Sequence, residues 1–493
     1  MSAPGHTVGE EGGRLARPPF AWLAAAAALG AALVLLFPDS YQQDGGNHFL
    51  GARWAWHHPW LLVDVWARPL FTLLYSLPAQ FGYPAAKLTT VAVALATAWQ
   101  TWRLAEHEGI ERPGLVVPLL FLQPVFLLLA SETMTEPLFA LIFVVALRLH
   151  RMGRVRAGMI VASLMVLARP EGFFLALLWG VWVLTDRRER RPWWRCLPST
   201  LWLATGAAAW WLAALALSGD PLYIAHNWPS NWGATDATYG SGSIFTYWHQ
   251  RSIIGGRLLY VPLLAGLVVL VRRRRLVEAT TSFVVLVVLH SIFWRFGLFG
   301  SAGYARYLVC VAPATALITL VGWNWIARFA SDRIRPRGAP VAPWAMRLAA
   351  ALVLGYSTLS ALSYVDSLSW SRDARAVATT WARVPRPLPA VRRVIWSQAY
   401  MCIQVDCDPY APWRLSGDRA RNLAILRASP PGTLVLWDAD QGPSWLGLRA
   451  PEIADLGYRV LRDDRYELRE TFPFHLWRPR ARTRTQRIVV LYR

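Results

Sequence analysis

The chain has 493 residues, of which 55% are hydrophobic and only 16% are charged, and 28 of them are tryptophan. Soluble domains usually carry about 25% charged residues, so this composition excludes an ordinary soluble protein and indicates a membrane protein. The net charge is +21, but the basic residues are dispersed between apolar runs instead of gathering on one soluble face, which argues against nucleic acid as a partner.

The first apolar run spans residues 20–37 and follows Arg14 and Arg17. A basic start before an apolar run can mimic a signal peptide, but no cleavage site of small residues follows it, and further apolar runs come after it. The sequence therefore predicts a retained first membrane helix.

Apolar runs of membrane-spanning character recur as far as residue 362, which predicts about eleven spans. They lie near residues 20–37, 84–103, 114–130, 134–149, 157–168, 172–185, 197–217, 253–271, 276–294, 307–326 and 341–362. Arginines gather in every second connection, which is the pattern of cytoplasmic loops. We therefore predict a polytopic α-helical membrane protein with its N-terminus in the cytoplasm and residues 363–493 outside.

Residues 157–185 decide this topology, because a single long helix there would invert every later loop. Pro170 and Gly172 break helices, so we predict two short spans that meet at Arg169-Pro170-Glu171-Gly172. Each covers roughly 18–21 Å, less than the ~30 Å hydrocarbon core, so Arg169 and Glu171 are expected below the outer surface. Charged groups at that depth line a site or a cavity, or they neutralise each other at a helix turn.

The connection at 38–83 is unusually rich in carboxylate, imidazole, guanidinium and indole groups. It contains Asp44-Gly45-Gly46-Asn47-His48, in which the glycine pair is expected to let the backbone turn tightly beside Asp44. An interfacial loop at headgroup level would explain the tryptophans but not this motif. We therefore interpret 38–83 as an active-site loop.

A second long outer connection, 218–252, is rich in Trp, Tyr, Gly and Ser and includes Trp228. Its composition resembles a sugar-binding surface, in which rings stack on sugar faces, although interfacial anchoring explains any single tryptophan equally well. A third outer loop, 295–307, ends in Tyr304-Ala305-Arg306-Tyr307.

Residues 363–493 have a different character, with fewer apolar residues and charges of both signs. A helix is predicted near 368–384 and another at 417–428, and β-like runs lie at 391–397, 433–438, 458–461 and 487–492. This alternation predicts a small α/β domain of about 110–130 residues. Cys402 and Cys407 are expected to form a disulfide if the compartment is oxidising.

Three motifs, in this order and topology, resemble the membrane-embedded glycosyltransferases of the GT-C class. They are Asp44-Gly-Gly-Asn-His48, Thr135-Glu136-Pro137-Leu138-Phe139 within 131–139, and Ala168-Arg169-Pro170-Glu171-Gly172. The second and third are similar to segments of bacterial mannosyltransferase-like members, and so is the Arg306-Tyr307 pair. The chain departs from many relatives in one respect, because Asp44 is followed by Gly45 where they carry a second acidic residue.

The resemblance implies a bacterial plasma-membrane enzyme that takes a sugar from a polyprenyl-phosphate donor. Residues 1–362 would form the transmembrane transferase domain with catalytic outer loops 38–83 and 218–252, and 363–493 the extracytoplasmic domain. The acceptor hydroxyl would belong to a lipid, a glycan or a protein, and membrane lipids surround the spans. Mannose is one candidate sugar, and a requirement for a divalent cation is left open.

Candidate roles follow from what each group can do. Asp44 is the candidate general base, which takes the proton of the acceptor hydroxyl. The leaving phosphate needs cations, for which Arg306, Arg169 and Arg68 are candidates in that order, with His48 as a further phosphate or sugar contact. The remaining candidates for substrate binding are Glu136, Glu132, Asp64, Glu171, Trp228 and Tyr304. Asp39, Asp64 and Glu132 compete with Asp44 as the base, and one displacement would invert the anomeric centre.

The alternative function is that of a polytopic transporter or lipid flippase. Such proteins usually show internal repeats with helices broken at matching positions, and no repeat is evident here. A non-catalytic membrane scaffold leaves the Asp44 motif unexplained.

Overall fold

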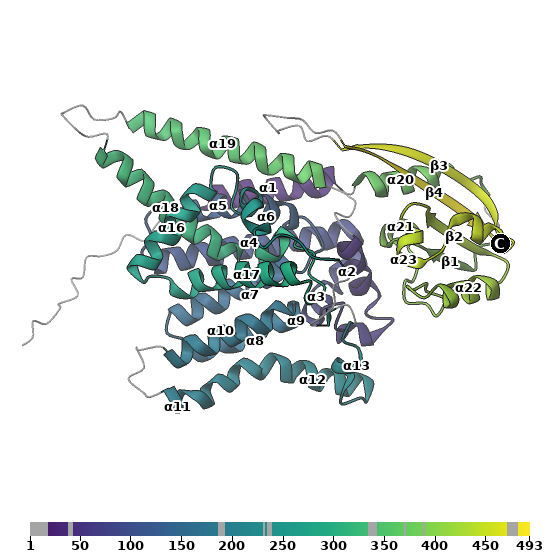
Figure 1. Ribbon diagram of the computed structural model, residues 1–493, viewed down its shortest axis with the longest axis horizontal. Helices are drawn as coiled ribbons and strands as arrows, with labels where there is room; N and C mark the ends of the chain where they lie inside the picture. The colour runs from purple at the N-terminus through teal and green to yellow at the C-terminus, as the bar shows by residue number, and fades with distance from the viewer. Residues whose placement is uncertain are drawn as a thin grey trace, which may run out of the picture.

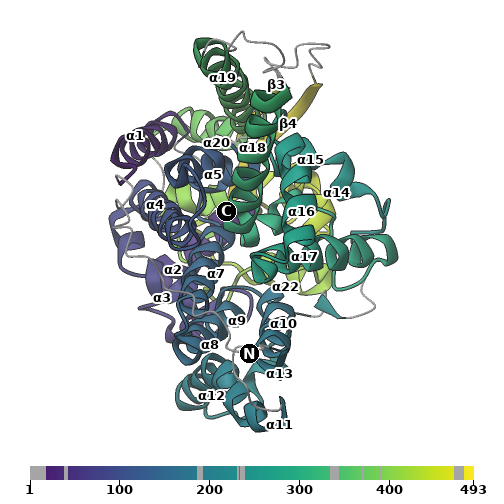
Figure 2. The same cartoon turned by 90° about the vertical axis from the view of Figure 1, so that its left-hand side faces the viewer.

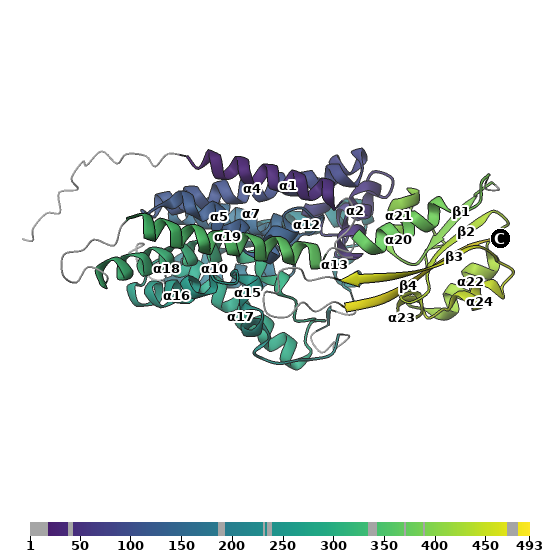
Figure 3. The ribbon, with the colours of Figure 1, turned by 90° about the horizontal axis from the view of Figure 1, so that it is seen from above.

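A computed structural model describes residues 18–37, 43–185, 193–229, 232–233, 239–333, 343–368, 371–387, 390–470 and 482–493. The molecule is elongated, with a large helical body at one end and a smaller unit that contains the β-sheet at the other (Figure 1). The view from above shows the same division, with the strands at the end away from α16 and α18 (Figure 3). We refer to residues 371–387, 390–470 and 482–493 as the C-terminal unit.

The helical body is built from helices of very different lengths. Its α-helices are α1 (Phe20–Leu36), α2 (Gln43–Trp54), α3 (Pro69–Tyr75), α4 (Tyr83–His107), α5 (Val116–Phe121), α6 (Pro124–Leu129), α7 (Glu136–Arg151), α8 (Val155–Ser163), α9 (Met165–Ala168), α10 (Glu171–Thr185), α11 (Trp193–Cys196), α12 (Thr205–Ser218), α13 (Tyr223–His226), α14 (Thr246–His249), α15 (Arg251–Ile254), α16 (Tyr260–Arg273), α17 (Val277–Phe296), α18 (Ala312–Arg333) and α19 (Pro343–Leu368). Short 3₁₀ turns lie among them at η1 (Pro59–Leu62), η2 (Pro78–Phe81), η3 (Pro113–Leu115), η4 (Leu197–Ala204) and η6 (Ala305–Val311).

The described part of this connection, 43–83, is largely helical, which corrects the prediction of a loop. Gly45 and Gly46 lie in the first turn of α2 and not in a tight turn beside Asp44. Glycine is a poor helix former, but both glycines are buried, and tertiary packing decides most helical stability. The carbonyl oxygen of Gly45 also accepts a 2.7 Å hydrogen bond from the Thr133 hydroxyl, which holds this turn against the segment before α7.

The count of eleven spans is not confirmed. Within the described residues, three helical stretches are long and apolar enough to cross a membrane: Trp193–Ser218, Val277–Phe296 and Ala305–Ser331. Phe20–Leu36, Val155–Ala168 and Glu171–Thr185 are shorter apolar helices. Proline is one reason, since Pro124 divides the predicted run 114–130 into α5 and α6.

The predicted break within 157–185 is present. Helix α9 ends at Ala168, Arg169 is extended (φ −161°, ψ 151°), and α10 begins at Glu171. A residue that precedes proline is disfavoured in the α-region, which explains the extended Arg169. Gly172 then permits a close approach, because a Cβ there would lie 2.5 Å from the backbone of Met165 and Val166.

The C-terminal unit has the predicted α/β character. It contains α20 (Ser371–Ala382), β1 (Arg393–Trp396), α21 (Ala399–Val405), α22 (Arg419–Ala428), β2 (Thr433–Asp438), α23 (Gly442–Leu446), α24 (Ala450–Ala454), β3 (Arg459–Glu470) and β4 (Arg482–Tyr492). The sheet order is β1-β2-β4-β3, with β1 parallel to β2 and the other pairs antiparallel. Every residue of β2 is buried, so this central strand holds the unit together.

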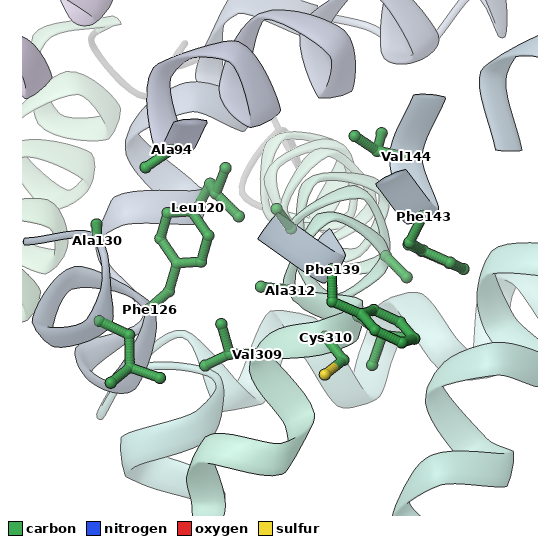
Figure 4. Packing of buried hydrophobic residues seen from close by; sticks show 14 of the residues in the cluster. Ala94, Leu120, Phe126, Ala130, Phe139, Phe143, Val144, Val309, Cys310 and Ala312 are labelled. Atoms are coloured by element: carbon green, nitrogen blue, oxygen red, sulfur yellow. The ribbon is translucent and has the colours of Figure 1, made fainter. Parts of the chain in front are cut away.

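The core of the helical body fixes the elements that carry polar residues. Phe139 and Phe143, one turn apart on α7, are fully buried, and so are Phe126 on α6 and Cys310 in η6 (Figure 4). Cys310 packs there as a small apolar side chain. Because interiors are close-packed, this cluster sets the positions of the N-terminus of α7 and of η6.

Candidate active site

A cavity of about 470 Å³ lies where the helical body meets the C-terminal unit. Segments far apart in sequence contribute to its lining, including the starts of α2 and α10, the C-terminal part of α17, η6 and α23. The lining includes Asp44, His48, Arg68, Arg169, Glu171, Trp228, His290, Tyr304, Arg306 and Trp445. Eight of these ten residues are candidates predicted from the sequence.

Asp44 and Arg306 form an ion pair in this cavity. Arg306 donates from Nη2 to Asp44 Oδ2 at 2.7 Å, and the side chain of Asp44 is 41% exposed while that of Arg306 is 10% exposed. Desolvation raises the pKa of Asp44, but the charge and hydrogen bond of Arg306 outweigh it, so the pKa lies below its ordinary value. Asp44 is therefore ionised at neutral pH and can accept a proton.

A second group of charges lies around Arg169. Its guanidinium makes two hydrogen bonds to the carboxylate of Glu171, at 2.8 and 3.1 Å, and its Nη1 lies 2.8 Å from Glu136 Oε1. Glu136 also lies 3.7 Å from Nε of Arg306, so this fully buried carboxylate sits between the two guanidinium groups. A buried charge is tolerated only when it is paired, and Glu136 supplies such a counter-charge to both arginines.

Arg68 differs from the other two arginines. Within the described residues it pairs with no carboxylate, and instead donates to the carbonyl of Val65 at 3.2 Å and lies over the Trp232 ring at 4.1 Å. Burial and the charge of Arg169 lower the pKa of Arg68 to about 9, which still leaves it protonated at neutral pH. Arg68 is thus a cation in the cavity that can bind an anion without first giving up a carboxylate.

His48 stacks on the indole of Trp66, with ring centroids 4.7 Å apart. Burial lowers the pKa of His48, as does the charge of Arg68, to about 3. The imidazole is therefore neutral at pH 7 and offers one N–H to a ligand, not a positive charge.

Three predicted substrate-binding residues do not line the cavity. Glu136 lies behind the guanidinium groups, Glu132 pairs with buried Lys87 at 2.9 Å, and Asp64 accepts a 2.6 Å hydrogen bond from the backbone of Ala67. All three therefore have structural partners. Asp39, another carboxylate considered as a base, lies outside the described residues.

Aromatic rings occupy one wall of the cavity. Trp228 packs edge-to-face on Trp232 with centroids 5.6 Å apart, and the Arg306 guanidinium lies 5.1 Å from the Tyr304 ring centroid. Trp228 and Tyr304 remain 37% and 41% exposed. These half-exposed rings present apolar faces of the kind on which sugars stack.

Sequence reasoning missed His290 and the contribution of the C-terminal unit. His290 is the one histidine in the apolar helix α17, and an ionisable residue within an apolar span is a functional candidate by default, so the signal was present. Gln441 and Trp445, beside and within α23, also line the cavity, and Trp445 is 52% exposed. Nothing in the sequence marked these two residues.

The C-terminal unit is held against α2 by polar contacts. Arg53, near the end of α2, makes a two-pronged ion pair with Asp406 at 2.7 and 2.8 Å, and His58 Nε2 lies 2.9 Å from Asp408. The disulfide expected between Cys402 and Cys407 is present and closes the turn that carries Asp406. The segment 406–408 therefore joins the C-terminal unit to the helix that bears Asp44.

Two carboxylates of the cavity are engaged with arginines. Among the described residues, no three His, Cys, Asp or Glu side chains gather as metal ligands. Asp44 and Glu171 each face a guanidinium instead.

Comparison with solved structures identifies the fold. The chain resembles ArnT from Cupriavidus metallidurans in a crystal structure bound to undecaprenyl phosphate, with a TM-score of 0.62, and in one of the apo state, with a TM-score of 0.59. In each case the sequence identity is 13% and the match covers 96% of this chain and 97% of ArnT. ArnT is a GT-C glycosyltransferase, so the GT-C resemblance is confirmed at the level of the fold. No protein-family model matches the chain, and no sequence match to a curated protein is found.

Proposed function

We propose that this protein is an integral membrane glycosyltransferase that moves a sugar from a polyprenyl-phosphate donor to an acceptor hydroxyl. The observation that carries the proposal is the carboxylate of Asp44 beside the guanidinium of Arg306 in a cavity of about 470 Å³. The shared fold supports it, because one of the similar ArnT structures is bound to undecaprenyl phosphate.

The cavity contains the groups that such a transfer needs. The acceptor oxygen attacks the anomeric carbon of the donor sugar, and its proton passes to the carboxylate of Asp44. The bond between the anomeric carbon and the phosphate oxygen breaks, and its electron pair leaves with polyprenyl phosphate. Guanidinium groups stabilise the charge that develops on this phosphate. The transition state resembles an oxocarbenium ion, and a single displacement inverts the anomeric centre.

The ion pair suggests how donor binding prepares the base. Arg306 and Asp44 satisfy each other as an ion pair. A donor phosphate competes with Asp44 for Arg306, and the carboxylate then becomes free to take the proton of the acceptor. Arg68 supplies the second phosphate contact, whereas Arg169 is the weakest candidate of the three because Glu171 and Glu136 already hold it.

The remaining candidates divide by position. We assign contacts with the sugar or the acceptor to Glu171, Trp228, Tyr304 and neutral His48, which line the cavity. Glu136, Glu132 and Asp64 instead orient the groups around it.

The proposed arrangement in the cell follows the arginine pattern. Residues 1–362 form the transferase domain in the bacterial plasma membrane with a cytoplasmic N-terminus, and residues 363–493 form an extracytoplasmic domain that covers the cavity. Helix α19 continues past residue 362 to Leu368. The helical body therefore ends a few residues later than the predicted domain boundary at residue 362. Mannose is the first sugar to test, with a lipid, glycan or protein as acceptor.

The test is turnover by the purified full-length protein in lipid nanodiscs. Polyprenyl-phosphate mannose and the corresponding donors with other hexoses and pentoses are supplied with a cell-envelope extract as the source of acceptors. Transfer of sugar with equal release of polyprenyl phosphate supports the proposal. Movement of intact donor between leaflets without cleavage would instead establish the flippase, which the ArnT-like fold does not favour.

A further inference from the structure

A second cavity, of about 360 Å³, lies between α16 and α18. These two helices lie side by side at the end of the helical body opposite the C-terminal unit (Figures 1 and 2). Arg273 and Leu276 contribute from the end of α16 and the turn after it, Trp325 and Arg328 from α18, and Glu111 from the turn after α4. The cavity therefore opens on the face remote from the candidate active site.

Two glycines allow α16 and α18, which form the walls of this cavity, to pack closely against each other. A Cβ on Gly266 would collide with the carbonyl oxygen of Ile318, and a Cβ on Gly322 with that of Pro262. Small residues at such a crossing let two membrane helices approach closely through their backbones. About one turn beyond this crossing, α16 and α18 carry the larger side chains Val269 and Trp325, which bound the cavity.

The charge of this cavity is positive. Its described lining has three guanidinium groups, those of Arg273, Arg275 and Arg328, against the single carboxylate of Glu111. Arg328 pairs with that carboxylate, and Arg275 donates to the carbonyl of Glu108 at 2.6 Å. The guanidinium of Arg273 makes no hydrogen bond or ion pair with any described residue, so it is available to a phosphate group.

Asn324 indicates a second property of the ligand, which is a hydrogen-bond donor. Its side chain is 7% exposed, and Nδ2 donates to the carbonyl of Glu111 at 2.7 Å. Its Oδ1 is buried and accepts no hydrogen bond from the described residues. A buried acceptor without a donor is costly, so a ligand that brings a hydroxyl group to this cavity would satisfy it.

An apolar groove continues from the cavity along α16. Ala265, Val268 and Val269 line it together with Trp325, and Arg272 and Arg273 lie at its charged end. Val268 and Trp325 are 51% and 42% exposed. A groove that is apolar on one side and cationic at its end matches an acyl chain joined to an anionic headgroup.

We propose that this cavity and its groove bind one anionic glycerophospholipid of the phosphatidylglycerol class. The phosphate lies at Arg273 and Arg275, a headgroup hydroxyl donates to Oδ1 of Asn324, and an acyl chain lies along Val268. Basic pockets between membrane helices are suited to such headgroups. A polyprenyl phosphate fits less well, because it has no headgroup hydroxyl to offer Asn324. The proposal does not depend on the reaction at the other cavity.

Lipid retention by the purified full-length protein tests the site. Native mass spectrometry is carried out after incubation with phosphatidylglycerol, phosphatidylcholine or polyprenyl phosphate, each with and without excess inorganic phosphate. We expect phosphatidylglycerol to be retained about fivefold more than the other two lipids and not to be displaced by inorganic phosphate. Arg273→Gln should lower its retention about fivefold. Arg274→Gln is the matched control, since Arg274 lines neither the cavity nor the groove, and it should leave retention unchanged.

Two further measurements keep the test decisive if Arg273→Gln fails to fold. A photoactivatable phosphatidylglycerol should label the wild-type protein within residues 265–276 or 321–329. Val269→Phe fills the junction of cavity and groove without changing a charge, and should lower retention. Equal retention of the three lipids, a preference for polyprenyl phosphate, displacement by inorganic phosphate, or labelling only elsewhere would overturn the proposal.

Discussion

Asp44 and Arg306 are separated by 262 positions in the sequence, yet a carboxylate oxygen of one lies 2.7 Å from a guanidinium nitrogen of the other. This contact joins the first turn of α2 to η6, which comes late in the sequence of the helical body, before α18 and α19. It places the proposed base beside the proposed phosphate ligand, and the first two predictions separate these roles.

Asp44→Asn should lower turnover by about 10²–10⁴-fold, because the amide keeps the size of the side chain but cannot act as a base. Binding of the polyprenyl-phosphate donor, measured separately, should persist. Asp64→Asn is the matched control, since Asp64 caps a turn outside the cavity lining, and it should lose far less activity. Full activity in the amide variants of Asp39, Asp44, Asp64 and Glu132 alike would refute the mechanism.

Arg306→Gln should change the pH dependence of transfer. Arg306 holds the pKa of Asp44 below its ordinary value against the opposing effect of desolvation, so its removal raises that pKa. Because the base must be ionised, the acid limb of the kcat/KM profile should move to higher pH, and the KM for the donor should rise. Arg68→Gln should raise the donor KM but leave the acid limb in place. Identical pH profiles for Arg306→Gln and the wild type would show that Arg306 does not set the pKa of the catalytic base.

Trp445→Ala should raise the KM for the acceptor about fivefold and leave donor binding unchanged. Trp445 lines the cavity from the C-terminal unit with 52% of its side chain exposed, and a lost aromatic contact costs about 0.5–1.5 kcal/mol. Trp194→Ala removes a similarly exposed indole on α11, away from the cavity, and serves as the control. An unchanged acceptor KM in Trp445→Ala would exclude the contact.

Arg53→Asp and Asp406→Arg should each lower kcat by loosening the attachment of α2, and the combined exchange should recover part of the loss. The pair is partly exposed, so its effect on stability is expected to be no more than about 1 kcal/mol. The informative comparison is therefore activity, with the melting temperature measured alongside. A double variant as impaired as the worse single variant would show that the pair does not position α2.

The proposed orientation is tested with reporter fusions. Reporters placed at Arg195, beside an arginine-rich connection, and at Gly417 in the C-terminal unit should report opposite sides of the membrane. The same side for both would contradict the cytoplasmic N-terminus and the extracytoplasmic C-terminal unit.

Local signals in the sequence were sufficient for several features. Pro170 and Gly172 marked the break between α9 and α10, and the strands β1, β2 and β4 appear where β-like runs were predicted. Strand β3 extends well past its predicted end at residue 461, because its charged residues pair along β4 as far as Glu470. Such pairing is decided by the partner strand and not by local composition.

Other features depended on contacts that no local pattern encodes. Gly45 and Gly46 predicted a turn, but burial against the segment before α7 keeps them helical. The sequence analysis also put Arg169 ahead of Arg68 as a phosphate ligand. Only the fold shows that Glu171 and Glu136 already neutralise Arg169 while Arg68 lies over Trp232.

The double attachment of α2 links the position of Asp44 to the C-terminal unit. One end of this helix is tied to the membrane part through Gly45 and Thr133, and the other to the C-terminal unit through Arg53 and Asp406. Any movement of the C-terminal unit relative to the helical body would therefore be transmitted through Arg53 to the helix that carries Asp44.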